Sequence, residues 1–184
     1  MKIEDLLREN NVLIEGHFLL TSGLHSGFYF EKFRILENPV LTGIFCEQLL
    51  KNVGDEYEWV IGPTTGGVII AHEVARQAGR LAGFSEPAED GRTVGRGFKI
   101  EGKGVLVVDD VLTTGKSLRE TITAVKEKGG IVRKIGVLID RSTEDPGFDY
   151  SAVYQAPVEN YAPDECPLCK KGVPIVRRGA KKRV

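Results

Sequence analysis

The sequence predicts an α/β fold, built on an open, mainly parallel sheet with flanking helices. Apolar strand-like runs alternate with segments of helical periodicity, which is typical of parallel strands joined by right-handed crossovers. The run at residues 105–108 is apolar throughout, as expected for a strand that is covered on both faces. A length of 184 residues suits one α/β domain. We therefore expect a single domain over residues 1–184, without internal repeats.

The N-terminal half is expected to start with a short amphipathic helix, because Ile3, Leu6 and Leu7 have helical spacing. The stretch GHFLLTSGLHSGFYFEK follows, and its glycines divide it into short extended pieces. A second helix is expected to begin at Pro39 and to stop near Gly54. EWVIGP then predicts a strand, and TTGG is expected to turn into a further helix.

The C-terminal half continues the alternation after a long irregular stretch. Residues 83–97 are rich in glycine and charge and show little periodicity, so we expect a mobile loop there. VLVVDD predicts a buried strand, and SLRETITAVKEKGG predicts a helix that ends at two glycines. KIGVLIDRS and SAVYQAP predict two more strands.

Bulk properties exclude several classes of partner. The formal charge is -1, so no global field favours nucleic acid, and we expect the basic C-terminal tail to be a solvated end. No apolar run approaches the roughly 18 residues of a membrane span, and no signal-peptide core is evident. We therefore expect no membrane partner and a cytoplasmic location.

The predicted strand at residues 105–110 ends on two carboxylates, Asp109 and Asp110. In open parallel sheets, ligands bind beyond this end of the strands. The next residues, VLTTGKS, open a helix, and a helix N-terminus favours phosphate. A phosphate cradle beside carboxylates that accept hydroxyls suits a phosphorylated sugar. A nucleotide P-loop is disfavoured, because Asp110 stands where the first glycine is needed. A purely structural helix cap is the other alternative.

The whole stretch VLVVDDVLTTGKS resembles the phosphoribosyl-diphosphate signature of the type I phosphoribosyltransferases. The resemblance implies that Asp109 and Asp110 hold the ribose hydroxyls and are the catalytic residues. It also implies that the following loop binds the 5-phosphate, and that GPTTGG contacts the pyrophosphate through Thr64 and Thr65. The phosphoribosyl-diphosphate residues of the loop are then Val111, Leu112, Thr113, Thr114, Gly115, Lys116 and Ser117.

The N-terminal segment resembles the hood of the orotate phosphoribosyltransferases, with the pattern G-x-F-x-L-x-S-G-x-x-S-x-x-Y starting at Gly16. The resemblance implies that residues 1–35 contribute a base-binding hood, in which Tyr29 and Phe30 contact orotate. It further implies that Arg141, in VLIDRS, faces the orotate carboxylate as a fork-to-fork partner, and that Thr113 touches orotate.

The sequence departs from this family at positions that usually carry cations. Thr21 and Gly66 stand where many members have lysine, and the mobile loop contains the acidic run SEPAEDG. Arg92 and Arg96 are the candidate replacements for binding the pyrophosphate, with Lys99 a weaker third. This departure motivates one alternative, a non-catalytic regulator that binds phosphoribosyl diphosphate. A purine phosphoribosyltransferase is the other.

The resemblance implies a reaction that joins orotate to 5-phospho-α-D-ribose 1-diphosphate, giving orotidine 5'-monophosphate and pyrophosphate in pyrimidine synthesis. Mg²⁺ is the implied cofactor, held by substrate oxygens and water. The family also implies a homodimer in which each subunit lends its mobile loop to the other's site. Arg92 and Arg96 would then approach the partner's pyrophosphate.

The cysteines predict neither a disulfide framework nor a metal site. Cys46 lies in the apolar stripe of a predicted helix and is expected in the core. Cys166 and Cys169 have metal-ligand spacing, but a second pair is missing and no histidine is near in sequence. We therefore expect no metal held by protein ligands alone, and we expect His25 to be a hydrogen-bonded surface residue.

Overall fold

A computed structural model describes residues 2–157 and 159–178. Its contacts divide the chain into two compact units. The core unit is the continuous segment Ile35–Ala156, and the hood unit combines Met1–Arg34 with Pro157–Val184. The hood unit therefore contains the C-terminal segment as well as the N-terminal residues that the sequence assigned to it. The last six residues of the basic tail lie outside the described residues.

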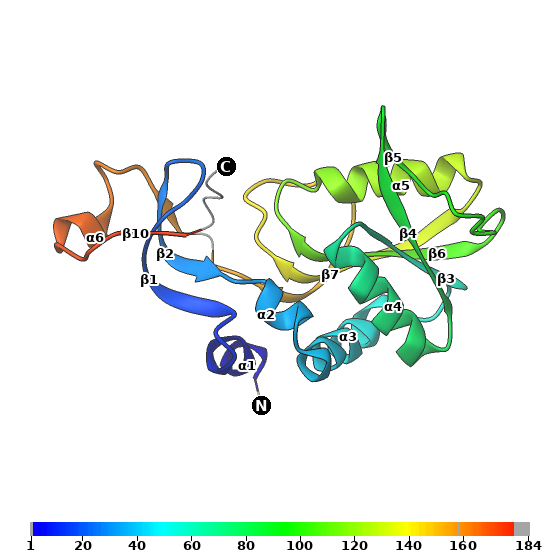
Figure 1. Ribbon diagram of the computed structural model, residues 1–184, viewed down its shortest axis with the longest axis horizontal. Coiled ribbons are helices and arrows are strands. Elements are labelled where there is room, and N and C mark those ends of the chain that lie inside the picture. The colour runs from blue at the N-terminus through cyan, green and yellow to red at the C-terminus, as the bar shows by residue number, and fades with distance from the viewer. Residues whose placement is uncertain (1, 158, 179–184) are drawn as a thin grey trace. The chain divides into compact units, whose positions relative to one another are not determined.

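The core unit is built on a six-stranded sheet with the order β5-β4-β3-β6-β7-β8 (Figure 1). Every neighbouring pair is parallel except β4 and β5, which are antiparallel. The expected open, mainly parallel sheet is confirmed. Its strands are β3 (Trp59–Pro63), β4 (Leu81–Ala88), β5 (Gly91–Thr93), β6 (Gly104–Leu112), β7 (Ile131–Asp140) and β8 (Ser151–Gln155).

Helices cover both faces of this sheet. Helices α3 (Pro39–Val53) and α4 (Gly66–Ala78) lie on one face, and α5 (Lys116–Glu127) lies on the other (Figure 1). The Asn38 side chain caps α3 by accepting the N–H groups of Val40 and Leu41 at 3.1 Å. Cys46 is fully buried on α3, as expected, and burial raises the pKa of its thiol to about 12. The short helix α2 (Phe33–Leu36) joins the two units along the chain.

The segment expected to be a mobile loop is instead a β-hairpin. β4 and β5 pair antiparallel, with Ala88 opposite Gly91, so only Glu89 and Asp90 remain for the turn. Two arginine side chains, Arg92 and Arg96, hydrogen-bond to residues of β4. Such side-chain contacts leave no periodic pattern in the sequence, so a loop was the wrong prediction.

The hood unit contains a second sheet of four strands, in the order β10-β1-β2-β9. β1 and β2 form an antiparallel pair, and the C-terminal segment supplies both outer strands, β9 antiparallel to β2 and β10 parallel to β1. The elements of this unit are α1 (Ile3–Glu9), β1 (Leu13–Leu19), β2 (His25–Phe30), β9 (Asn160–Tyr161), α6 (Pro167–Lys170) and β10 (Val176–Arg177).

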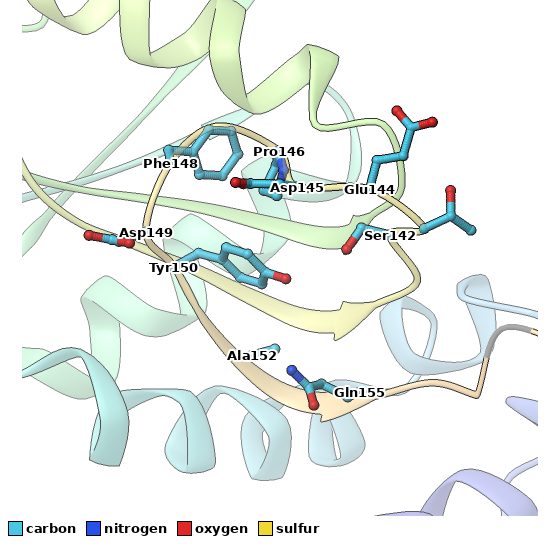
Figure 2. A pocket seen from close by; sticks show the side chains of 10 residues that line it. Ser142, Glu144, Asp145, Pro146, Phe148, Asp149, Tyr150, Ala152 and Gln155 are labelled. Atoms are coloured by element: carbon cyan, nitrogen blue, oxygen red, sulfur yellow. The ribbon is translucent and has the colours of Figure 1, made fainter.

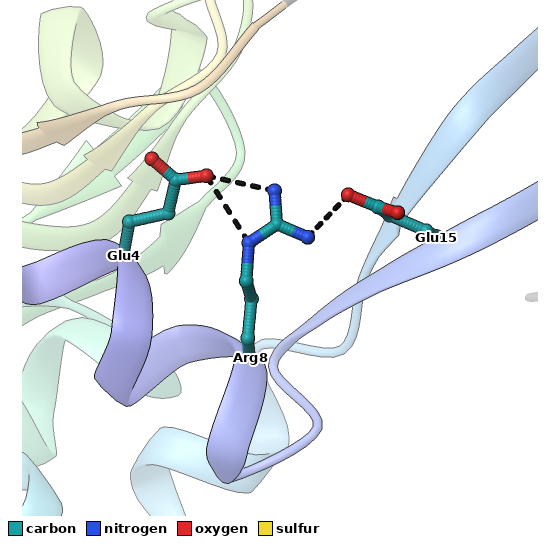
Figure 3. Close-up of polar contacts among 3 residues, drawn as sticks. All are labelled: Glu4, Arg8 and Glu15. Carbon is teal, nitrogen blue, oxygen red and sulfur yellow. Dashed lines mark hydrogen bonds and ion pairs between the residues drawn. The ribbon is translucent and has the colours of Figure 1, made fainter.

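An arginine connects the first helix of the hood unit to its first strand. Arg8 of α1 donates two hydrogen bonds to Glu4, at 2.7 and 3.1 Å, and one to Glu15 of β1 (Figure 3). Hydrogen bonds to these carboxylates raise the pKa of Arg8 further above its usual range. Among residues 2–157 and 159–178, no helix has the length and apolar character needed to cross a membrane.

Candidate active site

The two aspartates lie at the carboxyl end of β6 and are buried. The strand does not stop at them but continues to Leu112. Asp109 is 7% exposed and Asp110 is 5% exposed. One oxygen of Asp109 accepts the N–H of Asp110 at 2.8 Å, and the other accepts the hydroxyl of Ser117 at 3.0 Å. Asp109 thus ties the end of β6 to the first turn of α5.

Asp110 lies against the turn between β3 and α4. A Cβ atom added to Gly66 would stand 2.0 Å from Oδ2 of Asp110, so the Asp110 carboxylate would have to shift to admit one. Gly66 is one of the positions where the resemblance leads us to expect lysine, and here its missing side chain leaves room for the Asp110 carboxylate. The preceding Thr64–Thr65 peptide bond is cis.

The residues after β6 form a cavity of about 340 Å³ at the N-terminus of α5. Gly115 turns the chain there with a φ of 72°, in the left-handed region that suits glycine. Arg119 holds the loop by donating to the carbonyls of Thr114 at 2.8 Å and Pro146 at 2.9 Å. The cavity lining consists of Arg92, Val111, Leu112, Thr113, Thr114, Gly115, Lys116, Ser117, Leu118 and Glu120. Backbone N–H groups, hydroxyls and two cations therefore surround a space that suits a phosphate.

Arg92 of β5 belongs to this cavity in its own chain. Its guanidinium donates to Thr64 Oγ1 at 2.7 Å, to Ser85 Oγ at 2.8 Å and to the Ser85 carbonyl at 2.8 Å. Burial lowers the pKa of Arg92, while Glu120 and Asp109 act to raise it. The structure thus links the Thr64 turn to the α5 cavity through one cation. These contacts are all made within one chain.

Arg96 lies away from the cavity lining. It is exposed, and it forms two hydrogen bonds with Glu86 of β4, at 2.8 and 2.9 Å. Glu86 in turn has a lowered pKa because Arg96 donates to it. The sequence placed Arg92 and Arg96 together as pyrophosphate ligands, but the structure brings only Arg92 to the other phosphate residues. Ser85, which the sequence did not single out, is the residue that fixes Arg92.

Arg141 follows directly after β7, at the same end of the sheet as the aspartates. Its backbone N–H donates to the Leu112 carbonyl at 2.8 Å, which fixes the start of the VLTTGKS loop against the neighbouring strand. The preceding Asp140 ends β7 by accepting from Ser142 and from the Tyr150 hydroxyl at 2.7 Å. The sheet therefore carries Arg141 and Thr113 on adjacent strand ends.

A second pocket of the core unit has the opposite electrostatic character. It has a volume of about 640 Å³ and lies along the segment between β7 and β8 (Figure 2). Glu144, Asp145 and Asp149 are among its lining residues, so the pocket repels phosphates and carboxylates. The cavity at α5 is therefore the better candidate for an anionic ligand.

Tyr29 and Phe30 lie at the end of β2 in the hood unit. Phe30 is buried, whereas Tyr29 is half-buried and stands 5.6 Å from the Phe18 ring. The guanidinium of Arg178 lies over both Phe18 and Tyr29, at 5.8 and 5.6 Å from their ring centroids. Arg177 and Arg178 also line a small cavity with Thr21, the other position where lysine is common in the family. The C-terminal segment thus places Arg177 and Arg178 beside Thr21, a position where the hood itself carries no cation.

The histidines and cysteines of the hood unit contradict two expectations. His25, which was expected at the surface, is buried at 8% exposed, and the neighbouring His17 is 2% exposed. Their ring nitrogens and the sulfurs of Cys166 and Cys169 lie within 4.8 Å of one another. The CPLC motif therefore does have a second pair of possible ligands. Sequence distance hid this pair, because His17 and Cys166 are 149 positions apart.

A parallel sheet with two acids at one strand end and a cavity at the start of the next helix is an arrangement that suits a phosphorylated sugar. Residues 43–155 match the family model described as a phosphoribosyl transferase domain. This match covers more than half of the chain, and the chain therefore belongs to the phosphoribosyltransferase family.

The closer relatives narrow this class. The orotate phosphoribosyltransferase of Pelotomaculum thermopropionicum is 43% identical over 98% of this chain and 97% of its own length. That of a Thermoanaerobacter species is also 43% identical, over the same shares. A crystal structure of the Aeropyrum pernix orotate phosphoribosyltransferase matches with a TM-score of 0.71 and 27% identity, covering 82% of this chain and 92% of that one. Within its family, the chain belongs with the orotate phosphoribosyltransferases.

Proposed function

We propose that the protein transfers the phosphoribosyl group of 5-phospho-α-D-ribose 1-diphosphate to orotate, giving orotidine 5'-monophosphate and pyrophosphate for pyrimidine synthesis. The observation that carries the proposal is the connection between three groups of the core unit. Arg92 joins the Thr64 turn to the cavity at α5, and Asp109 joins that cavity to the strand end. This is the layout that a sugar with phosphates at both ends requires.

Each group has a chemical role in this proposal. The loop from Thr113 to Ser117 binds the 5-phosphate with its backbone N–H groups and hydroxyls. Asp110 and Asp109 accept the ribose hydroxyls. Positive charge builds on the ribose ring as the anomeric bond breaks, so buried carboxylates near the ring stabilise that charge. Arg92, with Thr64 and Thr65, binds the leaving pyrophosphate.

Mg²⁺ is the proposed cofactor, and the donor set fits an ion that the substrate brings with it. Asp109 and Asp110 are the hard oxygen donors that this cation prefers. Among the described residues, no third carboxylate, histidine or cysteine joins them in a metal-binding group. Such an ion would therefore take most of its ligands from substrate oxygens and water, and it would neutralise the diphosphate.

The orotate end of the proposal rests on the family resemblance. In the core unit, Arg141 pairs with the orotate carboxylate and Thr113 contacts the base. In the hood unit, Tyr29 and Phe30 contact the base through their backbone groups. We further propose that the enzyme is a cytoplasmic homodimer, as the family implies.

One assay tests the proposed reaction against its alternatives. The protein is mixed with Mg²⁺, phosphoribosyl diphosphate and either orotate or a purine base, and loss of orotate absorbance or formation of a purine nucleotide is followed. We expect turnover when the base is orotate and no turnover when the base is a purine. Turnover with a purine would identify a purine phosphoribosyltransferase. Binding of phosphoribosyl diphosphate without turnover of any base would identify a regulator.

A further inference from the structure

Four side chains of the hood unit converge on one point that the proposed reaction does not use. His17 lies on β1 and His25 on β2. Cys166 immediately precedes α6, and Cys169 lies within it. His17, His25 and Cys166 are buried, and Cys169 is exposed. The cluster therefore has three ligands inside the unit and one at its surface.

The spacing of the four donor atoms matches a tetrahedral metal site. His17 Nε2 lies 3.1 Å from His25 Nδ1, 3.4 Å from Cys166 Sγ and 3.7 Å from Cys169 Sγ. Cys169 Sγ lies 3.3 Å from His25 Nδ1. A tetrahedron with zinc–nitrogen bonds of about 2.0 Å and zinc–sulfur bonds of about 2.3 Å has ligand separations of roughly 3.3–3.8 Å.

Hydrogen bonding among the four groups does not account for this arrangement. His17 Nδ1 donates its proton to the Val173 carbonyl at 2.8 Å, so Nε2 of the neutral ring carries a single lone pair. Three polar atoms nevertheless surround Nε2, and one lone pair accepts only one hydrogen bond. A cation at the centre satisfies all four donor atoms at once.

The Val173 contact is itself typical of a metal-bound histidine. Such a histidine usually donates its other ring N–H to a carbonyl or carboxylate, which fixes the tautomer and orients the ring. Val173 follows α6, so the C-terminal segment supplies both the two sulfurs and the carbonyl that orients His17.

We infer that His17, His25, Cys166 and Cys169 bind one Zn²⁺ ion in a structural site. Two thiolates and two imidazoles are a donor set that favours zinc, and four protein ligands leave no open position for a substrate or a reactive water. The site joins the β1–β2 pair to the C-terminal segment, which otherwise pairs with it through the short strands β9 and β10. A unit this small commonly needs such a cross-link.

Metal analysis of the untagged full-length protein, purified under reducing conditions without chelator, tests the inference. We expect about one zinc ion per chain and little iron. Cys169→Ala and His25→Ala should each reduce the zinc content to below about a tenth of that value. Cys46→Ser is the matched control, because Cys46 is buried in the core unit and should keep the full zinc content.

A second measurement keeps the inference testable if the ligand variants fail to fold. Replacement of the bound ion by Co²⁺ in the wild-type protein should produce the strong visible absorption of tetrahedral cobalt and a thiolate charge-transfer band. Zinc-free wild-type protein, an octahedral cobalt spectrum, or a Cys166–Cys169 disulfide in the reduced preparation would each overturn the site. These readouts do not depend on enzymatic activity, so failure of the proposed reaction would leave them unaffected.

Discussion

Gly66 and Asp110 depend on each other, although 44 positions separate them in the sequence. The carboxylate of Asp110 occupies the space that a side chain at position 66 would need. From the sequence alone, Gly66 is noticeable only because many members of the family have lysine at this position. The role of Asp110 could be predicted, because a family signature surrounds it. The closeness of Gly66 to Asp110 could not be predicted, because it arises from a contact between the start of α4 and the end of β6.

The first prediction concerns the charge of Asp110. Asp110→Asn keeps the shape of the side chain but replaces a carboxylate that accepts ribose hydroxyls by an amide. We expect kcat/KM for phosphoribosyl diphosphate to fall roughly 10–1000-fold, or about 1.4–4 kcal/mol, with an unchanged melting temperature. Steady-state kinetics and thermal unfolding measure both. Unchanged kinetics would remove Asp110 from the site.

The second prediction separates base binding from sugar binding. Arg141→Ala removes the proposed partner of the orotate carboxylate, a charge-assisted hydrogen bond worth about 1.5–3 kcal/mol. We expect the KM for orotate to rise roughly 10–150-fold, while the KM for phosphoribosyl diphosphate changes little. An equal rise in both values would show that Arg141 acts on the shared phosphate or on the fold.

The third prediction distinguishes the two arginines of the β4–β5 region. Arg92→Ala removes a cation from the α5 cavity, so we expect a loss of roughly 10–100-fold in kcat/KM. Arg96→Ala is the matched control, because it breaks an exposed ion pair with Glu86 outside the cavity, and solvent screens such pairs strongly. Equal effects of the two variants would contradict the different placements that the structure gives them.

Among the secondary-structure elements, the β4–β5 hairpin shows what periodicity misses. β3, β6 and β7 are apolar runs, so the sequence predicts them directly. β4 and β5 instead carry glycine, proline and charge, which are typical of a loop. Within this region Arg92 bonds to Ser85 and Arg96 pairs with Glu86. These contacts join residues seven and ten positions apart and follow no regular repeat.

The contact between α3 and α4 carries the fourth prediction, on pH. Hydrogen bonds from Arg76, and then from Gln77, lower the pKa of Glu73 to about 2, although burial acts in the opposite direction. Gln77 also donates to the Gly43 carbonyl of α3 at 2.9 Å. A carboxyl with a lowered folded-state pKa stabilises the fold above its usual pKa of 4.5 and loses that effect as the pH falls toward 2.

Glu73→Gln should therefore lower the free energy of unfolding near neutral pH, and it should lower it less at a pH between about 2 and 4.5. Because Arg76 is largely exposed, solvent screening limits the expected effect to about 1 kcal/mol. Denaturant unfolding of both proteins at neutral pH and at a pH between about 2 and 4.5 measures this difference. Glu47→Gln, which breaks the exposed pair with Lys51 on α3, is the control. A difference between wild type and Glu73→Gln that does not change with pH would refute the assignment.

For the whole molecule, the sequence predicts the core unit far better than the hood unit. The core sheet follows from local patterns in one continuous segment. The hood sheet needs β9 and β10 beside strands near the other end of the chain, and both are only two residues long. No propensity or periodicity is measurable over two residues, so neither strand could be expected. The same long separation concealed the partners of the CPLC motif.

The fifth prediction concerns the proposed homodimer. In the structure, Arg92 contacts Thr64 and Ser85 of its own chain, so Asp110→Asn and Arg92→Ala disable the same site. Mixing these two impaired variants should give no more activity than the average of the two alone, even after subunit exchange is confirmed by mass. Recovery of up to about a quarter of the wild-type rate would show instead that Arg92 serves the partner, since half the dimers would be mixed and half of their sites intact.

The division of the chain between its two units also sets an order of assembly during protein synthesis. A ribosome releases the core unit as one uninterrupted stretch, which can fold while translation continues. The β1–β2 pair emerges first but must wait for β9 and β10, which are made after the core unit. The hood sheet is therefore completed after the core sheet. A nascent chain that stops before β9 would carry a finished sheet of six strands but lack the outer strands of its hood.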